Sequence, residues 1–412
     1  MKKLIILGAG IYQAPLIRQA KELGLFVIVV SSPGDYPGFA LADKVYETDT
    51  RDQEGVLEIA QSEKIDGICT SGTDVAVRTI GYVCQKMGLH GLSYEAACQV
   101  TDKALMKDAF YQKKVSTPRH IRASSMEKAQ QAAKRLGYPL LVKAVDSSGS
   151  RGIVIVERES RLKEAFSRAL QASRKDYVLV EEYIQAEEIG VDGFVKNGSL
   201  VFMAPHEKYL FRGEQVTVPA GHSFPYDTTK KQMREIQKQM QLAIEAVGLD
   251  ECPVNADVLV DGNKVWILEI GGRTGATCIP ELISLHYGFP FYQRIIQNAL
   301  GESVQFPRLV HVPCQGRLLM SPIDGVITSI DEEKLDILRQ KGVQIVIDYP
   351  AGHKVQAMKN GTDRVGHVVA KAASEAEFTA VYDQVQSAVQ IGGQTLYQLN
   401  RQAKDGEDGK NK

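Results

Sequence analysis

The sequence predicts a multidomain protein of mixed α/β and α+β class, and three patterns support that prediction. Residues 4–7 form an apolar run followed by a glycine turn, a helical pattern and a second apolar run, which is the order of a parallel βαβ unit. Residues 254–258 and 265–270 read as two strands joined by a tight turn. Residues 306–400 mix short strands with helices, as expected of a small α+β domain.

Length and composition narrow the class of protein. The chain has 412 residues, of which 44% are hydrophobic and 24% charged, and its formal net charge is −1. This is ordinary globular composition, and the absence of a basic excess argues against a nucleic-acid partner. No apolar stretch is long enough to span a membrane, and the six cysteines lack metal-binding spacing. We therefore expect a cytoplasmic protein with reduced thiols.

The order of the expected elements sets the domain boundaries. Strands and helices alternate up to residue 100, which predicts a Rossmann-like first domain over residues 1–100. Gly8 and Gly10 begin a dinucleotide fingerprint, but Gln13 replaces its third glycine, so the glycines are assigned to a tight turn and a dehydrogenase is the weaker alternative. The remaining expected parts are a second domain over 101–305 with subdomains at about 115–180 and 181–305, a C-terminal domain over 306–400, and a disordered polar tail over 401–412.

Two carboxylates on neighbouring predicted strands are the strongest sign of a site. Asp257 and Glu269 each interrupt an apolar run, and a buried carboxylate is costly unless a cation pairs with it. Hard oxygen ligands suit Mg²⁺ held against substrate phosphates, and Arg273 follows close enough to reach a phosphate. The alternative is a hairpin whose edge carboxylates are solvated.

A small-residue loop and a strand end add weaker signals. Residues 147–152 join two predicted strands, and backbone N–H groups of such a hairpin tip can cover phosphates, with Lys143 at the strand end beside them. A plain flexible hairpin is the alternative. Residues 181–184 end another strand, where free backbone groups can pair with an adenine edge, and Glu188 follows with a carboxylate for ribose hydroxyls.

Taken in order along the chain, these motifs resemble the ATP-grasp superfamily of carboxylate–amine ligases. The resemblance rests on order and spacing over residues 1–305 and is looser beyond them. It implies an ATP-grasp fold, with a pre-ATP-grasp domain at the N-terminus and ATP held between two α+β subdomains. The ATP-binding residues that it implies are Lys103, Lys143, Ser147, Ser148, Gly149, Ser150, Glu181, Glu182, Tyr183, Ile184 and Glu188.

The resemblance also implies the metal site and the reaction. Asp257 and Glu269 hold Mg²⁺, with Mn²⁺ as its alternative, and Arg273 neutralises an acyl-phosphate intermediate. Many members carry an asparagine two residues after the second metal carboxylate, whereas this chain has Gly271, so the number of metal ions stays open. The implied enzyme joins a carboxylate to an amine and releases ADP and phosphate, with an amino acid as the expected substrate.

The sequence specifies the substrates and partners less closely than the ATP and metal sites. A purine-pathway ligase that carboxylates or uses formate is one alternative, and a nucleotide-binding regulator without catalysis is another. Glu281 is a candidate for binding a substrate ammonium, or else starts a helix after Pro280. His206 and His222 lie in a stretch expected to be irregular, where they bind substrate or serve the structure. We expect small-molecule partners, no nucleic acid or membrane, and a homodimer.

Overall fold

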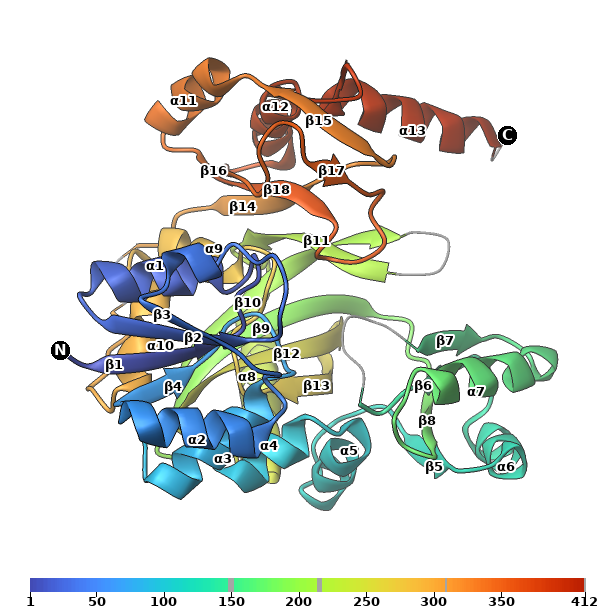
Figure 1. Cartoon of the computed structure of the whole chain (residues 1–412). Helices are drawn as coiled ribbons and strands as arrows, with labels where there is room; N and C mark the ends of the chain where they lie inside the picture. Colours follow the sequence, from blue (N-terminus) through green and yellow to red (C-terminus); the bar gives the residue numbers. More distant parts are fainter. Residues whose placement is uncertain (147–151, 213–216, 308–309, 411–412) are drawn as a thin grey trace. The chain divides into compact units, whose positions relative to one another are not determined.

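The computed structural model describes residues 1–146, 152–212, 217–307 and 310–410. The chain divides into two compact units. The first comprises Met1–Pro205, Asp227–Ala276 and Pro290–Phe306, and the second comprises His206–Tyr226, Thr277–Phe289 and Pro307–Lys412. Figure 1 labels the elements of both units, which are described separately below.

The first unit begins with a parallel sheet. Its strands, in order across the sheet, are β3 (Lys44–Glu47), β2 (Phe26–Ser31), β1 (Lys3–Leu7) and β4 (Gly67–Cys69). Residues 4–7 are fully buried, as expected for a parallel strand covered on both faces. The connecting helices are α1 (Ala14–Glu22), α2 (Gln53–Glu63), α3 (Val77–Met87) and α4 (Tyr94–Val100). The βαβ prediction is confirmed, and the loops after β3 and β4 place Arg51 and Asp74 at the carboxyl edge of the sheet, where α/β folds bind ligands.

An antiparallel sheet of four strands follows in the same unit. Its order is β5 (His120–Ala123), β8 (Val178–Glu182), β6 (Leu140–Lys143) and β7 (Ile153–Val156). Helices α6 (Met126–Leu136) and α7 (Leu162–Gln171) supply alanines and larger apolar residues to one shared core with these strands. The predicted hairpin of β6 and β7 is therefore present, and Lys143 is the last residue of its first strand.

The rest of the first unit carries the two predicted carboxylate strands. β12 (Cys252–Asp261) and β13 (Lys264–Gly271) form the expected hairpin, and β12 also pairs with β9 (Glu187–Lys196), which neighbours β10 (Ser199–Arg212). Helix α8 (Lys230–Val247) packs against β13 and against α5 (Lys103–Gln112), and it ends at Gly248, whose φ of +70° is left-handed. α10 (Phe291–Ala299) contacts β12, α1 and β4.

The second unit has an α+β fold. The outer part of β10 pairs with β11 (Thr217–Phe224), and the sheet continues through β14 (Cys314–Met320), β18 (Arg364–Lys371) and β16 (Gln344–Ile347). A smaller sheet has the order β17 (Lys354–Val355), β15 (Gly325–Ile330), β19 (Val389–Ile391) and β20 (Gln394–Thr395). Its helices are α9 (Ile279–Tyr287), α11 (Glu332–Gln340), α12 (Glu375–Gln386) and α13 (Leu396–Lys410).

Two local expectations differ from the structure of the second unit. The segment around His206 and His222 is a strand pair, although Pro205 and Pro219 made a strand pattern hard to recognise. The tail expected to be disordered is helical as far as Lys410, because a polar, charged composition does not exclude a helix. All six cysteines lie in described segments and carry free thiols. Among the helices that the structure describes, none has both the length and the apolar character needed to cross a membrane.

Candidate active site

The carboxylate pair is aligned by a bulge in the β12–β13 hairpin. Asp257 lies directly opposite Glu269, whereas the next residue of β12, Val258, pairs with Ile267, so that Leu268 is an extra residue on β13. The bulge shifts the alternation of β13, because the fully buried Ile267 is followed by the next core residue after three positions instead of two. Glu269 is thereby turned away from the core and towards the face that carries Asp257.

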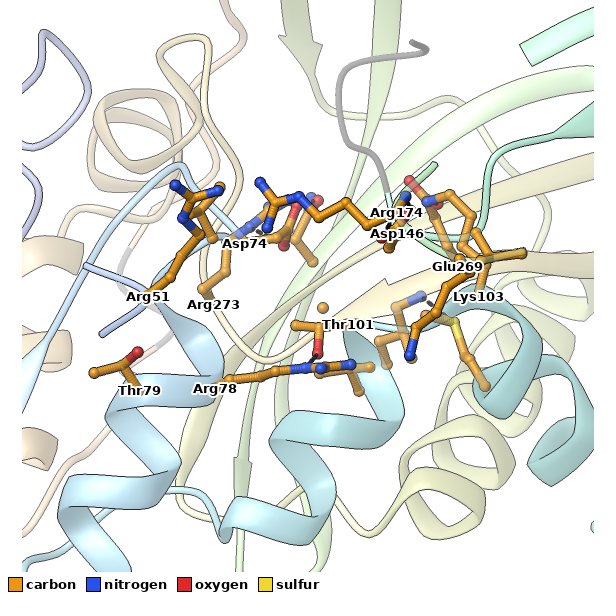
Figure 2. Close-up of a pocket in the computed structure, with 18 of the residues that line it drawn as sticks. Arg51, Asp74, Arg78, Thr79, Thr101, Lys103, Asp146, Arg174, Glu269 and Arg273 are labelled. Carbon is orange, nitrogen blue, oxygen red and sulfur yellow. Dashed lines mark hydrogen bonds and ion pairs between the residues drawn. The ribbon is translucent and has the colours of Figure 1, made fainter. Parts of the chain in front are cut away.

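A cleft of about 660 Å³ lies next to this hairpin within the first unit. Figure 2 shows that its lining comes from the carboxyl edge of the parallel sheet, from α5, from the segment before the small-residue loop and from β13. Its charged and amide-bearing lining residues are Arg51, Gln53, Asp74, Arg78, Lys103, Asp146, Arg174, Lys175, Asn255, Glu269 and Arg273. The cleft therefore joins sequence positions that lie far apart in the chain.

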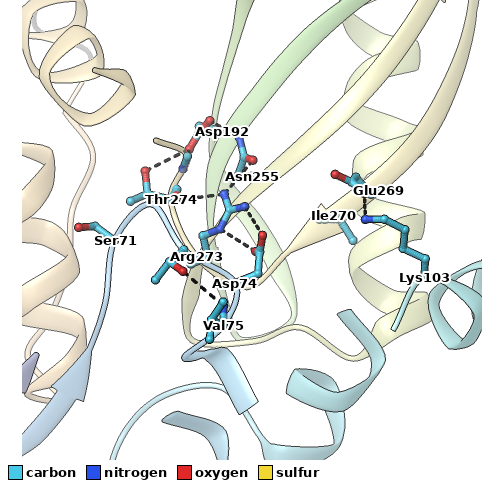
Figure 3. Close-up of polar contacts among 12 residues, drawn as sticks. Ser71, Asp74, Val75, Lys103, Asp192, Asn255, Glu269, Ile270, Arg273 and Thr274 are labelled. Atoms are coloured by element: carbon cyan, nitrogen blue, oxygen red, sulfur yellow. Dashed lines mark hydrogen bonds and ion pairs between the residues drawn. The ribbon is translucent and has the colours of Figure 1, made fainter. Parts of the chain in front are cut away.

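Lys103 faces the carboxylate pair from the first turn of α5. Asp102 caps this helix by accepting hydrogen bonds from the backbone of Ala104 and Leu105 at 3.0 and 3.2 Å, which fixes where Lys103 starts. The Lys103 ammonium donates to Glu269 Oε2 (Figure 3). Burial alone would lower the pKa of Lys103, but the Glu269 carboxylate outweighs burial and the pKa is raised, with Asp257 acting in the same direction.

Arg273 is held by groups from two other parts of the first unit. Its Nε and Nη2 donate to the two carboxylate oxygens of Asp74 at 2.7 Å each, and its Nη1 donates to Asn255 Oδ1 at 3.0 Å (Figure 3). Burial would lower the pKa of Arg273, but the carboxylates of Asp74 and Asp192 outweigh it and the pKa is raised. The bidentate pair fixes the plane of the guanidinium.

The same contacts explain why residue 271 is a glycine. A Cβ at Gly271 would lie 3.1 Å from Asp74 Oδ1, so the Arg273-bound carboxylate occupies the space that an asparagine side chain would need. Asn255 lies opposite Gly271 in the hairpin register and provides a carboxamide from the neighbouring strand. That carboxamide donates to Asp192 at 2.7 Å and accepts from Arg273, so it supports the arginine.

Asp192 anchors the turn that follows β13. It is fully buried on β9 and accepts hydrogen bonds from Thr274 Oγ1 at 3.1 Å and from the backbone N–H of Gly275 at 2.8 Å. A buried carboxylate with several donors is satisfied and rigid. The sequence signal for Asp192 was the same as for Asp257, a single acid within an apolar strand.

A second charged group lies between α5 and the antiparallel sheet. Glu181 is fully buried, and its two oxygens face Lys143 Nζ at 2.5 Å and Lys107 Nζ at 3.1 Å. Lys107 also donates to Thr117 Oγ1 at 2.6 Å. Burial lowers the pKa of Lys107, whereas for Glu181 the two lysines outweigh burial and lower the carboxyl pKa. Sequence reasoning missed Lys107, which lies one helical turn after Lys103.

The structure also gives the surroundings of the remaining residues that were expected to bind ATP. Glu182 forms an exposed ion pair with Arg119 at 3.0 Å, and the N–H of Tyr183 donates to Pro139 O at 3.4 Å. Ile184 and Glu188 are partly exposed, the latter on β9. Ser147, Ser148, Gly149 and Ser150 lie outside the described residues.

The three tentative substrate residues belong to the second unit. Glu281 is half-buried in the first turn of α9. His206 and His222 are fully or almost fully buried, and their rings meet edge-on with centroids 4.6 Å apart. Because both histidines are buried, a structural role is favoured over substrate binding.

Lowering the pH is expected to destabilise the second unit through His222. Burial, followed by nearby His206 and Lys208, holds the pKa of His222 well below its ordinary value. The unfolded chain therefore binds a proton below about pH 6.5 that the folded chain excludes, and stability falls by up to about 1.4 kcal/mol per pH unit. Urea unfolding at about pH 7.5 and about pH 5 should show a smaller pH-dependent loss in His222→Gln than in wild type or His353→Gln. Equal losses in all three proteins would contradict this origin.

Two segments of the chain match known domain families, and the chain is similar to known ligases and transferases. Residues 136–281 match the ATP-grasp domain family, and residues 317–392 match the L-amino acid ligase C-terminal domain 2. The chain is 25% identical over 327 residues to the carbamoyl phosphate synthase large chain, C-terminal section, of Aquifex aeolicus, covering 74% of this chain and 59% of that protein. It is 24% identical over 316 residues to the formate-dependent phosphoribosylglycinamide formyltransferase of Thermococcus kodakarensis, covering 73% and 71%. The chain thus spans little more than half of the first relative.

Two solved structures are similar over nearly their whole length. The phosphoribosylglycinamide synthetase of Anaerococcus prevotii has a TM-score of 0.78 at 27% identity, covering 95% of this chain and 99% of that one. The L-amino acid ligase of Bacillus licheniformis also has a TM-score of 0.78, at 19% identity, covering 96% and 99%, and shares the fold.

The fold, the paired carboxylates and these matches define the class of protein. The chain has the ATP-grasp fold, and its residues 136–281 match the ATP-grasp domain family. More particularly, it combines an ATP-grasp domain with the C-terminal domain of L-amino acid ligases. The family resemblance read from the sequence is confirmed.

Proposed function

We propose that this enzyme joins an amino acid, activated at its carboxylate, to an amine at the expense of ATP. The carboxylate oxygen attacks the γ-phosphorus and ADP leaves, giving an acyl phosphate. The amine nitrogen then attacks the acyl carbon, phosphate leaves, and the nitrogen loses a proton. Each step moves negative charge, so the protein's contribution is positioning and charge neutralisation.

One arrangement carries this proposal: Lys103, Glu269 and Arg273 line the same cleft, with Asp257 opposite Glu269. The cations suit a transferring phosphoryl group, and the bidentate hold of Asp74 keeps the Arg273 guanidinium in place. Among the described residues that line the cleft there is no serine, cysteine or histidine. This composition favours direct attack by the substrate carboxylate over a covalent enzyme intermediate.

The residues also fit Mg²⁺ and ATP. The Asp257 and Glu269 carboxylates both favour the charged form of Lys103, and they would favour a bound cation in the same way. In the described part of the chain, no group of three or more acidic, histidine or cysteine side chains forms a metal cage. Two carboxylates completed by nucleotide phosphates are the usual arrangement for Mg²⁺, which would neutralise phosphate charge there. We assign Lys143 and Lys107 to the nucleotide, with Glu181 positioning their ammonium groups.

The amino-acid substrate is supported by the match of residues 317–392 to the L-amino acid ligase C-terminal domain 2. A purine-type ligase that carboxylates or uses formate is the second candidate, because the formate-dependent formyltransferase of Thermococcus kodakarensis is similar to this chain. Formate or bicarbonate replaces the amino acid in that case, so the two candidates differ in which acid supports ADP formation.

The test is ADP formation by the purified enzyme with ATP, Mg²⁺ and pools of amino acids, in parallel with formate and bicarbonate. Hydroxylamine should trap the acyl phosphate as a hydroxamate when an amino acid is present. Formate- or bicarbonate-dependent turnover without a response to amino acids would transfer the assignment to the second candidate. AMP and pyrophosphate as products would overturn the acyl-phosphate mechanism altogether.

A further inference from the structure

The cleft carries more positive charge than the expected chemistry at Glu269 and Arg273 needs. Among its described lining residues the basic ones are Arg51, Arg78, Lys103, Arg174, Lys175 and Arg273, and the acidic ones are Asp74, Asp146 and Glu269. An excess of one sign in a cleft concentrates ligands of the opposite sign. Neighbouring carboxylates neutralise only part of this positive charge.

Carboxylates form ion pairs with three of the six basic side chains. Lys103 pairs with Glu269 and Arg273 with Asp74, while Arg51 pairs with Asp49 just outside the cleft. Among the described residues, no carboxylate lies within ion-pair distance of the other three basic side chains, Arg78, Arg174 and Lys175. Asp146 accepts the backbone N–H of Arg174 at 3.1 Å and the hydroxyl of Ser173 at 2.8 Å, not the Arg174 guanidinium.

Arg78 is held in place although it lacks an acidic partner. Its Nε donates to Thr101 Oγ1 at 2.5 Å, and that hydroxyl in turn donates to Ala97 O at 2.7 Å. Figure 2 shows the Arg78 side chain extending from α3 towards Thr101 at the cleft. The side chain is half-buried, so its remaining N–H groups are partly desolvated. The hydrogen bonds from Arg51 lower the pKa of Asp49, and the charge of Arg174 acts in the same direction.

The position of these cations separates them from the groups assigned to ATP. Arg78 lies in the first turn of α3, on the carboxyl side of the parallel sheet, and Arg174 and Lys175 precede β8. The nucleotide is assigned to Lys143 and Lys107, which belong to the antiparallel sheet and α5. Arg78, Arg174 and Lys175 line the same cleft as Arg273, whereas Lys143 and Lys107 are not among its described lining residues.

We propose that the acid activated by this enzyme carries a second anionic group, a carboxylate or a phosphate, that is bound by Arg78 together with Arg174 and Lys175. The proposal rests on the proposed function and specifies its substrate class. The reacting carboxylate lies at the Arg273 end, and the second anion lies at the carboxyl edge of the parallel sheet. A guanidinium fork provides the paired donors that either anion accepts.

Matched acids test this proposal. The purified enzyme is assayed for ADP and hydroxamate with glutamate against glutamine, aspartate against asparagine, and O-phosphoserine against serine. Within at least one pair, kcat/KM should be at least about tenfold higher for the acid with the second anion, as expected for charge-assisted hydrogen bonds. The three pairs also show whether the second group is a carboxylate or a phosphate. Equal use of both members in every active pair overturns the proposal while the ligase assignment stands.

A variant links the preference to Arg78. Arg78→Gln should reduce the preference within the favoured pair by about tenfold or more, chiefly through KM, since the lost contact does not involve the reacting group. Arg135→Gln, which removes an exposed charge on α6 outside the cleft, should retain the wild-type preference. A preference unchanged in Arg78→Gln contradicts the site. Failure of every acid to yield ADP, although ATP binds, would instead reject the proposed function and this proposal with it.

Discussion

Glu269→Gln is expected to lower kcat/KM for ATP-dependent ligation by at least about a hundredfold while the fold persists. The carboxylate lies opposite Asp257 and receives the Lys103 ammonium. The amide keeps the volume and one acceptor oxygen but removes the charge that attracts a metal ion. The expected cation site then retains only the Asp257 carboxylate. Lys103, which is expected to contact phosphate, loses its charged partner.

ADP and hydroxamate formation measured over a Mg²⁺ titration checks this expectation. Glu58→Gln, at an exposed position of α2, is the matched control and should behave like wild type. Thermal unfolding of both variants separates a lost site from a lost fold. Near-normal turnover of Glu269→Gln at saturating Mg²⁺ would remove Glu269 from the metal site.

Glu181→Gln is expected to cause the largest loss of stability, about 3–5 kcal/mol in the free energy of unfolding. Lys107 and Lys143 both face the Glu181 carboxylate, and the Lys107 and Glu181 side chains are only 2% and 0% exposed. Neutralising the acid leaves two buried ammonium groups close together without a counter-charge. Urea unfolding measures the change directly.

The neighbouring residue provides the control. Glu182→Gln breaks only the exposed pair with Arg119, whose side chain is 61% exposed, and should cost less than about 1 kcal/mol. Adding Lys107→Met to Glu181→Gln should recover part of the loss, because it removes one of the unpaired charges. A loss below about 1 kcal/mol for Glu181→Gln would show that water or other groups already neutralise the lysines.

The sequence predicted the parts of the site that are local in the chain. The β12–β13 hairpin has a short turn and alternating strands, so the pairing of Asp257 with Glu269 followed from neighbouring residues. The bulge at Leu268 was not predicted, because one extra residue changes neither composition nor the apolar pattern enough to be seen. Without the structure, the orientation of Glu269 remained undetermined.

Contacts between distant segments explain what was missed. Asp74 and Arg273 are 199 positions apart, and the loop after β4 gives no sign in sequence that its acid meets the residues that follow the β12–β13 hairpin. Lys107 was overlooked because α5 looked like an ordinary amphipathic helix, in which a lysine usually faces water. Arg51 and Arg78 lie in the first domain. The incomplete glycine fingerprint of this domain gave no reason to expect ligand-binding residues there.

Under the proposed mechanism, the Asp74–Arg273 pair makes the first hundred residues part of the phosphoryl-transfer apparatus. A fragment that begins at the ATP-grasp domain would retain the lysines assigned to the nucleotide, but its arginine would lose the carboxylate that fixes its plane. Such a fragment is expected to hold nucleotide without efficient turnover. Exchange of N-terminal domains between related ligases should therefore alter catalytic rate as well as substrate choice, unless an acid equivalent to Asp74 is carried along.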